Sequence, residues 1–286
     1  MTVADPYLPA VRDAVARALA EDLAPLGDIT AALLPPDATA TARFVSRDAG
    51  VIAGTACATE TFAQLDPAIE VRWTAVDGMA VAPGEAFGEV TGPLAAILTG
   101  ERTALNFLCH LSGIATRTRR FADAAARGGP ARIWDTRKTT PGLRTLEKAA
   151  VRAGGGANHR ANLSDWVMFK DNHLEVLGIA EGVAAARSAW PGRLVHVEVG
   201  DLDELSQALE AGADAILLDN MTPEEVTVAV ASTDEWVAAG GPRPLLESSG
   251  GITVENAAAY SATGVDLLST SQITQSAPAL DIGLDI

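Results

Sequence analysis

The sequence contains very few cysteines. Cys57 and Cys109 are the two present, they lie far apart, and no Cys-x-x-Cys pair occurs. Disulfide frameworks and cysteine zinc centres need closely patterned cysteines, so the sequence excludes a small disulfide-stapled fold and a cysteine-based zinc site. Two isolated cysteines in 286 residues are typical of a reducing compartment, and we expect a cytoplasmic protein.

Long apolar runs are also missing. No stretch reaches the roughly 18 consecutive apolar residues that indicate a membrane-spanning helix. The first residues, MTVADPYLPAVRDAV, include early acids and no apolar core, so they do not resemble a signal peptide. The net charge of −16 repels nucleic acid and anionic lipid. We therefore expect a soluble protein that binds neither nucleic acid nor membrane.

Lysine is the scarcest of the charged residues. The chain has 18 arginines but three lysines, Lys138, Lys148 and Lys170. Lysine is a compact charge on a flexible stem, and arginine does not replace it at a reactive site. Lys148 lies in a helical stretch and is interpreted as a solvated or paired surface charge, whereas Lys138 and Lys170 follow predicted strands. Seven cations between residues 137 and 170, opposed by two acids, predict a site for a small polyanion.

Two regions with different patterns follow one another along the chain. Up to about residue 126, helical spacing at 7–20 and 101–126 flanks short β-like runs punctuated by glycine at 42–46, 51–53, 69–76 and 86–90. From residue 131, short apolar strands alternate with helical stretches, which implies parallel strands with right-handed crossovers. The predicted strands are 132–134, 166–169, 194–199, 215–218, 245–246 and 265–268, and the helical stretches between them include 174–189, 201–211, 223–231 and 253–262.

Six strand–helix units favour an incomplete α/β barrel over an eight-unit one. We therefore predict an α/β protein with an N-terminal α+β open-faced sandwich domain over residues 1–112 and a barrel over residues 113–286, whose extreme C-terminus returns to the first domain. A doubly wound open sheet is the alternative fold. No Gly-x-Gly-x-x-Gly follows a strand, which disfavours a dinucleotide-binding version of that sheet.

Polar residues follow all six predicted strands. Working groups of an α/β barrel lie at the carboxyl ends of its strands, where the loops meet. Loop polarity alone would explain one or two such strands, but not all six. The strand-end residues are Asp135–Lys138, Lys170–His173, Glu198, Asp219–Asn220, Glu247–Gly251 and Ser269–Ser271.

Two kinds of phosphate-related group stand among these residues. The small residues Ser249–Gly251 and Ser269–Ser271 follow consecutive strands, where backbone N–H groups can approach a phosphate. Glu198 and Asp219 are carboxylates on neighbouring strands, and such a pair suits Mg²⁺ or ribose hydroxyls. The alternative is a pair of buried carboxylates matched to Lys or Arg.

The order of these groups resembles the quinolinate phosphoribosyltransferase family. The resemblance rests on DTRKTTPGLR from Asp135, GGGANHR from Gly154 and KDNH from Lys170, and it extends over nearly the whole chain. It is supported by ERTALN from Glu101, Glu198-Val199, Leu218–Asn220 and the ESSGGI segment from Glu247.

The resemblance implies an enzyme that joins quinolinate to phosphoribosyl pyrophosphate (PRPP), with Mg²⁺, to give nicotinate mononucleotide, pyrophosphate and CO₂. It implies a dimer or a multiple of dimers, in which the N-terminal domain of one subunit covers the barrel of another. Catalysis would fall to Lys138, Lys170, Glu198 and Asp219, with Glu198 and Asp219 binding Mg²⁺ and ribose. Quinolinate would meet Arg102 from the neighbouring subunit and Arg137, His159, Arg160 and Lys170, and PRPP would meet Lys138, Lys170 and the phosphate-loop residues Ser249, Gly250, Gly251, Ser269 and Ser271.

Rival interpretations use the same residues. Lys170 after a strand would suit a Schiff-base aldolase, although Arg137, His159 and Arg160 fit a dicarboxylate better than a neutral carbonyl. A paralogue with another ligand, or a binder without catalysis, is the third interpretation. It draws on Ser271 alone, because the family has a glycine near that place. A positive φ there would cost a serine on the order of 1 kcal/mol.

Overall fold

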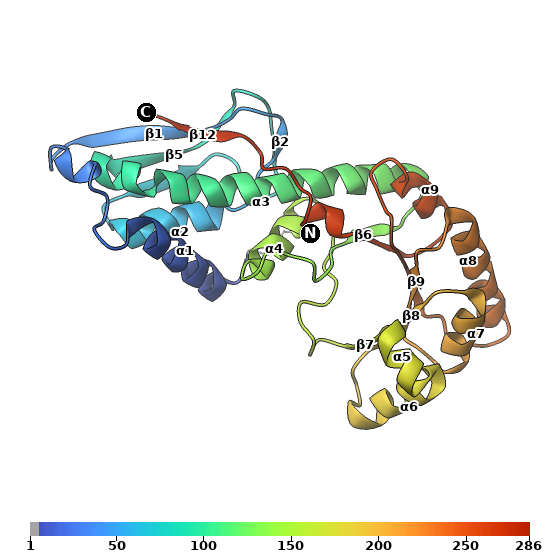
Figure 1. Cartoon of the computed structure of the whole chain (residues 1–286). Coiled ribbons are helices and arrows are strands. Elements are labelled where there is room, and N and C mark those ends of the chain that lie inside the picture. Colours follow the sequence, from blue (N-terminus) through green and yellow to red (C-terminus); the bar gives the residue numbers. More distant parts are fainter. Residues whose placement is uncertain (1–5) are drawn as a thin grey trace. The chain divides into compact units, whose positions relative to one another are not determined.

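The computed structural model describes residues 6–286, and their packing forms two units (Figure 1). Unit 1 contains the described residues up to Arg119, together with Lys138–Gly156 and Ile273–Ile286. Unit 2 contains Arg120–Arg137 and Ala157–Gln272. Within the described part of the chain, no helix is both long and apolar enough for a membrane span.

Unit 1 is built on a four-stranded antiparallel sheet with the order β12-β1-β5-β3. The strand β12 comes from the C-terminus and pairs with β1, so that Phe44 lies opposite Leu284. The small pair β2 and β4 stands apart from this sheet. The strands are β1 (Thr39–Ser46), β2 (Gly50–Val51), β3 (Glu70–Trp73), β4 (Ala80–Val81), β5 (Ala86–Pro93) and β12 (Ile282–Asp285), and the helices are α1 (Leu8–Leu23), η1 (Ala31–Leu33), α2 (Thr55–Leu65), α3 (Leu94–Gly128, which continues into unit 2) and α4 (Arg144–Ala153).

Helices cover one face of this sheet. One buried cluster contains Phe44 of β1, Phe87 of β5, Phe62 of α2 and Leu108 of α3. The alternation of β1 places Thr41 and Arg43 on its opposite face, where both are exposed. The cluster therefore forms the hydrophobic core that joins the sheet to α2 and α3.

Unit 2 contains six parallel strands in the order β6-β11-β10-β9-β8-β7. The first and last strands along the chain, β6 and β11, are paired, with Ser269 opposite Trp134. This pairing is expected of strands that follow one another around a barrel, and the sheet stays unpaired between β6 and β7. The strands are β6 (Arg132–Trp134), β7 (Val167–Phe169), β8 (Val195–Val199), β9 (Ala215–Asp219), β10 (Leu245–Ser249) and β11 (Leu267–Ser269).

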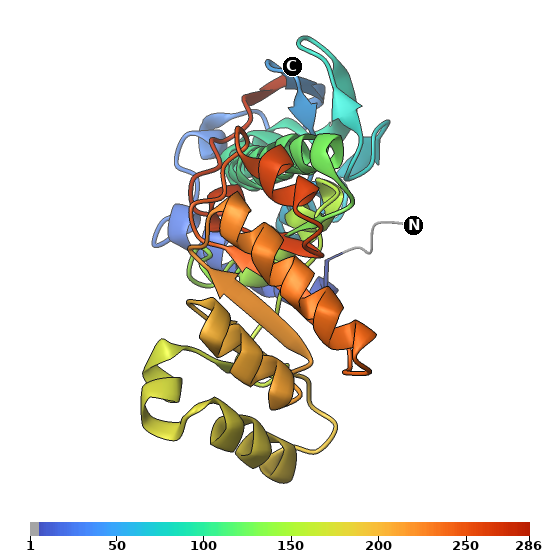
Figure 2. The ribbon, with the colours of Figure 1, turned by 90° about the vertical axis from the view of Figure 1, so that its right-hand side faces the viewer.

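Helices follow the strands and lie along the outside of the unit (Figures 1 and 2). They are α5 (Asp171–Leu177), α6 (Ile179–Ala189), α7 (Leu202–Glu210), α8 (Pro223–Ala238), α9 (Ala257–Ala262) and the short η2 (Ser271–Ile273). Side chains of even-numbered β9 residues, such as Ile216 and Leu218, are fully buried, as are Val195 and Val197 of β8. This apolar face is the one that helices with an apolar stripe must cover.

The predicted fold class is confirmed: an incomplete α/β barrel accompanies an N-terminal α+β domain. The predicted helix 174–189 is divided at Gly178, whose φ of +73° interrupts it between α5 and α6. The boundary between 1–112 and 113–286 stays a prediction, because the two packing units interleave along the chain.

Candidate active site

The strand register places the polar strand residues of unit 2 on one face. Glu198 of β8 and Glu247 of β10 both pair with Leu217 of β9, and Asp219 pairs with Ser249. Residues paired across a parallel sheet project to the same side, and residues two apart share a face. The face opposite the apolar one therefore carries Trp134, Met168, His196, Glu198, Leu217, Asp219, Glu247, Ser249, Leu267 and Ser269.

Lys170 and Glu198 form an ion pair at the ends of neighbouring strands. The Glu198 side chain is largely buried, and that burial raises its pKa above the ordinary value. The hydrogen bond and charge of Lys170 oppose the shift, whereas the negative charge of Asp219 adds to it. Asp219 accepts a hydrogen bond from Asn220 Nδ2 at 2.6 Å. The negative charges of Glu198 and Asp219 therefore oppose each other, which is an arrangement that a further cation would stabilise.

His159 and Arg160 enter this face from the segment between β6 and β7. Both are buried, at 7% and 8% exposure. The buried carboxylate of Asp135, just after β6, accepts the backbone N–H of His159 at 2.9 Å and the Asn158 side-chain amide at 2.6 Å. Asp135 therefore anchors the segment that carries His159 and Arg160. Burial lowers the pKa of Arg160, and the charge of Arg137 acts in the same direction, so an anion near the two guanidinium groups would relieve their repulsion.

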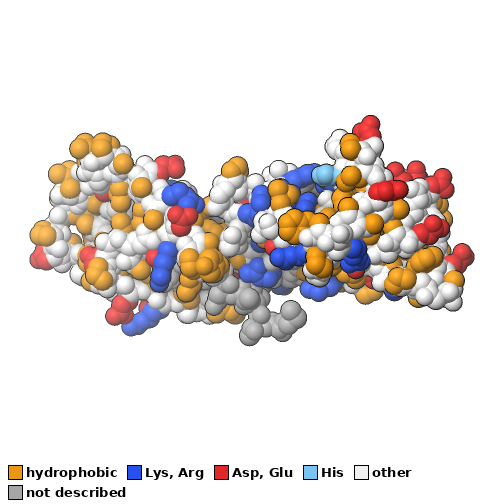
Figure 3. Space-filling model, turned by 90° about the horizontal axis from the view of Figure 1, so that it is seen from below, with side chains coloured by type: hydrophobic (Ala, Val, Ile, Leu, Met, Phe, Trp, Pro, Cys, Tyr) orange, Lys and Arg blue, Asp and Glu red, His pale blue; other side chains and the backbone are white. Residues whose placement is uncertain are grey.

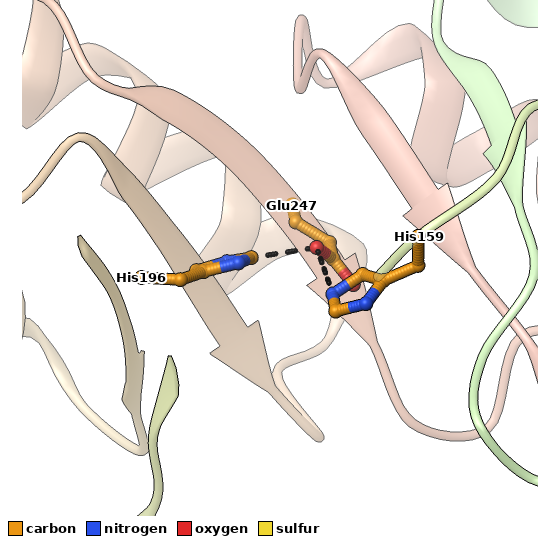
Figure 4. A group of neighbouring side chains, drawn as sticks. All are labelled: His159, His196 and Glu247. Carbon is orange, nitrogen blue, oxygen red and sulfur yellow. Dashed lines mark ion pairs between the residues drawn. The ribbon is translucent and has the colours of Figure 1, made fainter. Parts of the chain in front are cut away.

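Two residues of this face received no role from the sequence: Glu247 was predicted only as one of the polar strand-end residues, and His196 was missed. Glu247 is 1% exposed, and the Nε2 atoms of His159 and His196 each lie 3.5 Å from its Oε2 (Figure 4). The atoms that these three side chains could offer to a metal ion lie within 4.8 Å of one another, which is close enough for them to bind one ion together. The alternation of apolar and polar residues in VHVEV could have indicated His196, because it puts His196 on the same polar face as Glu198.

The loop after β10 has the conformation that its glycines permit. Gly250 and Gly251 have φ of +92° and +64°, and a Cβ on Gly250 would lie 2.1 Å from the Asn220 side chain. Ser271 begins η2 and does not have a positive φ; among the described residues, Asn220 is the non-glycine that does. The conformational free-energy cost that a positive φ would impose on Ser271 therefore does not arise. The helix expected from residue 253 begins at Ala257, so its N-terminus does not directly follow Gly251.

Three predicted residues belong to unit 1. Lys138 is exposed, and its carbonyl accepts a hydrogen bond from Thr274 at 2.8 Å. Arg102 is exposed on α3 and lines an open pocket of about 680 Å³ that also includes Asn106, His110 and Pro141. Lys148 was interpreted as a surface charge, and this was wrong: it is 4% exposed, because α4 buries most of its circumference.

The buried Glu147 of α4 connects this pocket to the segment after Lys138. His110 Nε2 lies 2.8 Å from Glu147 Oε1, and the Thr140 backbone N–H donates to the same carboxylate at 3.3 Å. The first turn of α4 therefore holds the segment in which Lys138 lies.

Positive charge gathers locally in an acidic protein. Figure 3 shows Lys and Arg side chains close together with a histidine on one face, while acidic side chains lie mostly towards its edges. Within unit 2 the cations around the polar sheet face are Arg137, Arg160 and Lys170. The arrangement suits an anionic ligand, and an ion-paired Lys170 is a poor nucleophile for a Schiff base.

Comparisons with known proteins agree with this chemistry. Residues 28–112 match the family model of the quinolinate phosphoribosyl transferase N-terminal domain, and residues 114–285 match that of the C-terminal domain. The chain is 43% identical over 281 residues to a nicotinate-nucleotide pyrophosphorylase (carboxylating) of Mycobacterium leprae, with 97% of each chain covered. It is 39% identical to a quinolinate phosphoribosyltransferase (decarboxylating) of Nicotiana tabacum, covering 94% of this chain and 80% of the tobacco protein.

Solved structures give the same relationship. The nicotinate-nucleotide pyrophosphorylase of Francisella tularensis superimposes with a TM-score of 0.92 at 38% identity, covering 100% of this chain and 99% of that one. The human nicotinic acid phosphoribosyltransferase, at 15% identity and a TM-score of 0.58, covers 98% of this chain and 73% of its own, and shares the fold.

Proposed function

The chain belongs to the quinolinate phosphoribosyltransferase family, and we propose that the polar sheet face of unit 2 is where it carries out that family's reaction. It transfers the phosphoribosyl group of PRPP to quinolinate with decarboxylation, giving nicotinate mononucleotide, pyrophosphate and CO₂ in NAD biosynthesis. The observation that carries the location is the grouping of Arg137, Arg160 and Lys170 around a pair of carboxylates, Glu198 and Asp219.

Quinolinate binds to the cations of this face. It is a planar dianion, and guanidinium forks match carboxylates in geometry as well as charge. Arg137, His159, Arg160 and Lys170 are the proposed partners of its two carboxylates. The repulsion between Arg137 and Arg160 supports this assignment, because a dianion between them would compensate both charges.

The phosphoribosyl group of PRPP lies between the carboxylate pair and the glycine loop. The two segments share one end of the sheet, because Ser249 ends β10 before Gly250 and Gly251, and Ser269 ends β11 shortly before Ser271. Asn256 Nδ2 donates to the Gly251 carbonyl at 2.9 Å, and Thr270 Oγ1 donates to the Ile252 carbonyl at 3.2 Å. These contacts hold the loop and support its assignment to the 5-phosphate.

Glu198 and Asp219 are the proposed ligands of Mg²⁺ and the ribose hydroxyls. They lie at the ends of the neighbouring strands β8 and β9, and carboxylate oxygens are the ligands that Mg²⁺ prefers. The mutual repulsion of the two carboxylates is what a divalent cation would offset. When bound, Mg²⁺ supplies positive charge to the pyrophosphate of PRPP.

The reaction needs positioning and charge compensation rather than a protein nucleophile. The pyridine nitrogen attacks the anomeric carbon as pyrophosphate leaves, and the ribose gains positive charge that Glu198 and Asp219 stabilise. Lys138 and Lys170 balance the departing pyrophosphate. The pyridinium that forms stabilises the electron pair that the departing CO₂ leaves on the ring carbon, and that carbon then takes up a proton from water to give nicotinate mononucleotide. Holding both substrates in line accounts for much of the rate in such a reaction.

Arg102 completes the quinolinate site of a neighbouring subunit in a dimer or a multiple of dimers. It is exposed on α3 and lines the open pocket of unit 1. An exposed guanidinium at an open pocket is available to a second chain, and symmetric pairs are the commonest assemblies of soluble proteins.

A cytoplasmic location fits the thiols. Cys57 is buried and Cys109 is partly buried, and both are free. Burial raises the pKa of Cys57 to about 12, so it stays a neutral thiol at physiological pH. A reducing compartment is where such unpaired cysteines are usual.

Product analysis tests the proposal directly. Purified protein is incubated with quinolinate, PRPP and Mg²⁺, with nicotinate as a parallel substrate. Nicotinate mononucleotide, pyrophosphate and CO₂ from quinolinate alone are expected. A folded protein that leaves quinolinate unchanged would contradict the substrate assignment, and trapping of a keto substrate by borohydride would favour the aldolase interpretation instead.

A further inference from the structure

A carboxylate is buried between two imidazole rings on the polar face of unit 2. Glu247 projects from β10, His196 from β8 and His159 from the segment before β7, and all three are at most 7% exposed. Figure 4 shows both rings directed at the Glu247 carboxylate, and the two Nε2–Oε2 distances are 3.5 Å. Nothing in the reaction described above uses Glu247 or His196.

The ring of His159 is enclosed on several sides. Its centroid lies 5.4 Å from that of Trp134, 5.0 Å from that of Trp166 and 5.7 Å from that of His196. Its backbone N–H is held by Asp135. The backbone position and the ring surroundings are therefore fixed, which leaves the rotation of the imidazole about its last side-chain bond to be set by polar contacts.

Glu247 supplies such a contact. Burial alone would raise its pKa, but the two imidazoles that face it keep that pKa below the ordinary value. A buried carboxylate without a partner is costly, so the 3.5 Å contact between Glu247 Oε2 and His159 Nε2 couples the positions of the two side chains. Because Glu247 is 1% exposed, any effect on a ligand passes through the side chains that it touches.

We propose that Glu247 is a positioning residue for His159, whose imidazole it orients for contact with a carboxylate of quinolinate. His196 packs on the other side of the carboxylate and confines it. The proposal rests on the role of His159 under the proposed function. It makes Glu247 a determinant of affinity for the aromatic diacid and leaves PRPP binding to other residues.

The test is Glu247→Gln in the full-length enzyme. Glutamine keeps the shape but offers half the acceptor capacity and no charge, so the KM for quinolinate is expected to rise about tenfold or more. The KM for PRPP is expected to stay within about twofold of the wild type, because His159 does not meet PRPP in this arrangement. A residue that only supports the fold would not raise the KM for quinolinate while leaving the KM for PRPP unchanged.

Two further variants sharpen the measurement. Ser248→Ala changes the next buried residue of β10, whose side chain lies on the opposite face and whose hydroxyl has no hydrogen-bond partner among residues 6–286. This control is expected to match the wild type for both substrates. His159→Asn is combined with Glu247→Gln, and the double variant should bind quinolinate no more weakly than His159→Asn alone.

The outcomes separate the inference from the proposed function. If His159→Asn raises the quinolinate KM but Glu247→Gln does not, or if their effects simply add, the positioning role is overturned and the proposed function stands. If His159→Asn has no effect either, the assignment of His159 to quinolinate falls with it.

A measurement on the wild type covers the case in which Glu247→Gln does not fold. The chain has four histidines, so long-range ¹H–¹⁵N spectra of the imidazoles are readily assigned with His159→Asn. A protonated His159 Nε2 is expected, and a bare one overturns the proposal. Stoichiometric binding of Zn²⁺ alone that requires Glu247 would also overturn it, because the three side chains would then form a metal centre.

Discussion

Two adjacent glycines after β10 have different reasons to be glycine. Both have positive φ, which costs an L-residue roughly 1–2 kcal/mol. A side chain on Gly251 would point into open space, whereas one on Gly250 would overlap Asn220, the residue that hydrogen-bonds to Asp219. The backbone strain is shared, but the steric conflict belongs to Gly250 alone.

Alanine substitutions should therefore separate strain from steric conflict. Gly250→Ala is expected to lower kcat/KM for PRPP by about tenfold more than Gly251→Ala, because it displaces Asn220 as well as straining the loop. Steady-state kinetics of the two variants with PRPP as the varied substrate measure this ratio. Equal losses in the two variants would show that contact with Asn220 has no part in PRPP binding.

Cys57 makes stability depend on pH in the alkaline range. Its pKa is 9.0 in an ordinary setting and about 12 when buried in the folded chain. Above pH 9 the unfolded chain loses this proton while the folded chain keeps it, so unfolding becomes more favourable as pH rises towards 12. Below pH 9 the residue contributes no pH dependence.

Replacing Cys57 by alanine should flatten this part of the stability profile. The variant is expected to be less stable by a constant amount from the lost packing, but its urea midpoint should fall less steeply than that of the wild type between about pH 8 and about pH 10.5. Urea titrations at several pH values give the two slopes. Parallel slopes would contradict a buried, neutral thiol at this position.

Among the elements, α4 is the helix whose sequence misleads most. LRTLEKAAV carries Glu147 and Lys148 in succession, which favours a solvated helix, yet both residues are buried. A charged residue is expected to be exposed only when no partner is near it in the folded chain. The Glu147 carboxylate contacts His110 of α3 and accepts the Thr140 backbone N–H. Such partners come from distant parts of the chain and are invisible to local pattern.

Lys148→Ala is consequently expected to destabilise the protein. Alanine removes three methylenes of a buried stem, and at about 0.8 kcal/mol for each buried methylene the loss is roughly 2 kcal/mol. Thr145→Ala on the exposed side of the same helix is the matched control, with an expected change within about 0.5 kcal/mol. Chemical denaturation of both variants measures the difference. A stability of Lys148→Ala equal to that of the control would restore its interpretation as a surface charge.

The barrel strands were predictable because their signal is local. Short apolar runs followed by polar residues mark β6 to β11, and all six predicted strands overlap the observed ones. The elements that were not predicted, α2, β4 and β12, lack this signal. β12 is four residues long and is a strand because β1 lies beside it, which depends on a pairing across most of the chain.

The site was predictable in part for the same reason. Glu198 and Asp219 lie at the ends of strands that the pattern identifies, and the register then brings them to one face. Glu247 belongs to the family pattern, but its partners His159 and His196 come from separate segments, and their convergence is a property of the tertiary structure. Lys138 and Arg102 lie in unit 1, and their roles stay predictions.

At the scale of the whole molecule, the net charge opposes the ligand. A chain of net charge −16 repels both quinolinate and PRPP in bulk, so binding depends on local cations. Arg137, Arg160 and Lys170 supply them within unit 2, and Arg102 is the cation proposed to come from a neighbouring subunit. If Arg102 serves a neighbouring subunit, the enzyme can close its anion site only as an oligomer.

Complementation between two inactive variants tests this arrangement. Arg102→Ala and Arg137→Ala are expected to be inactive alone, but a mixed dimer would contain one site with both arginines if Arg102 acts on the neighbouring subunit. Random pairing then gives about a quarter of the wild-type activity, since half the dimers are mixed and each has one intact site of two. If Arg102 serves its own chain, every site lacks one arginine and no activity returns.

Mixing Arg137→Ala with Lys170→Ala is the control: both residues belong to unit 2 of one chain, so that mixture should stay inactive in either case. Activity in the control mixture would show that residues of unit 2 also reach the site of a neighbouring subunit. Arg102 could then not be singled out as the residue that crosses the interface.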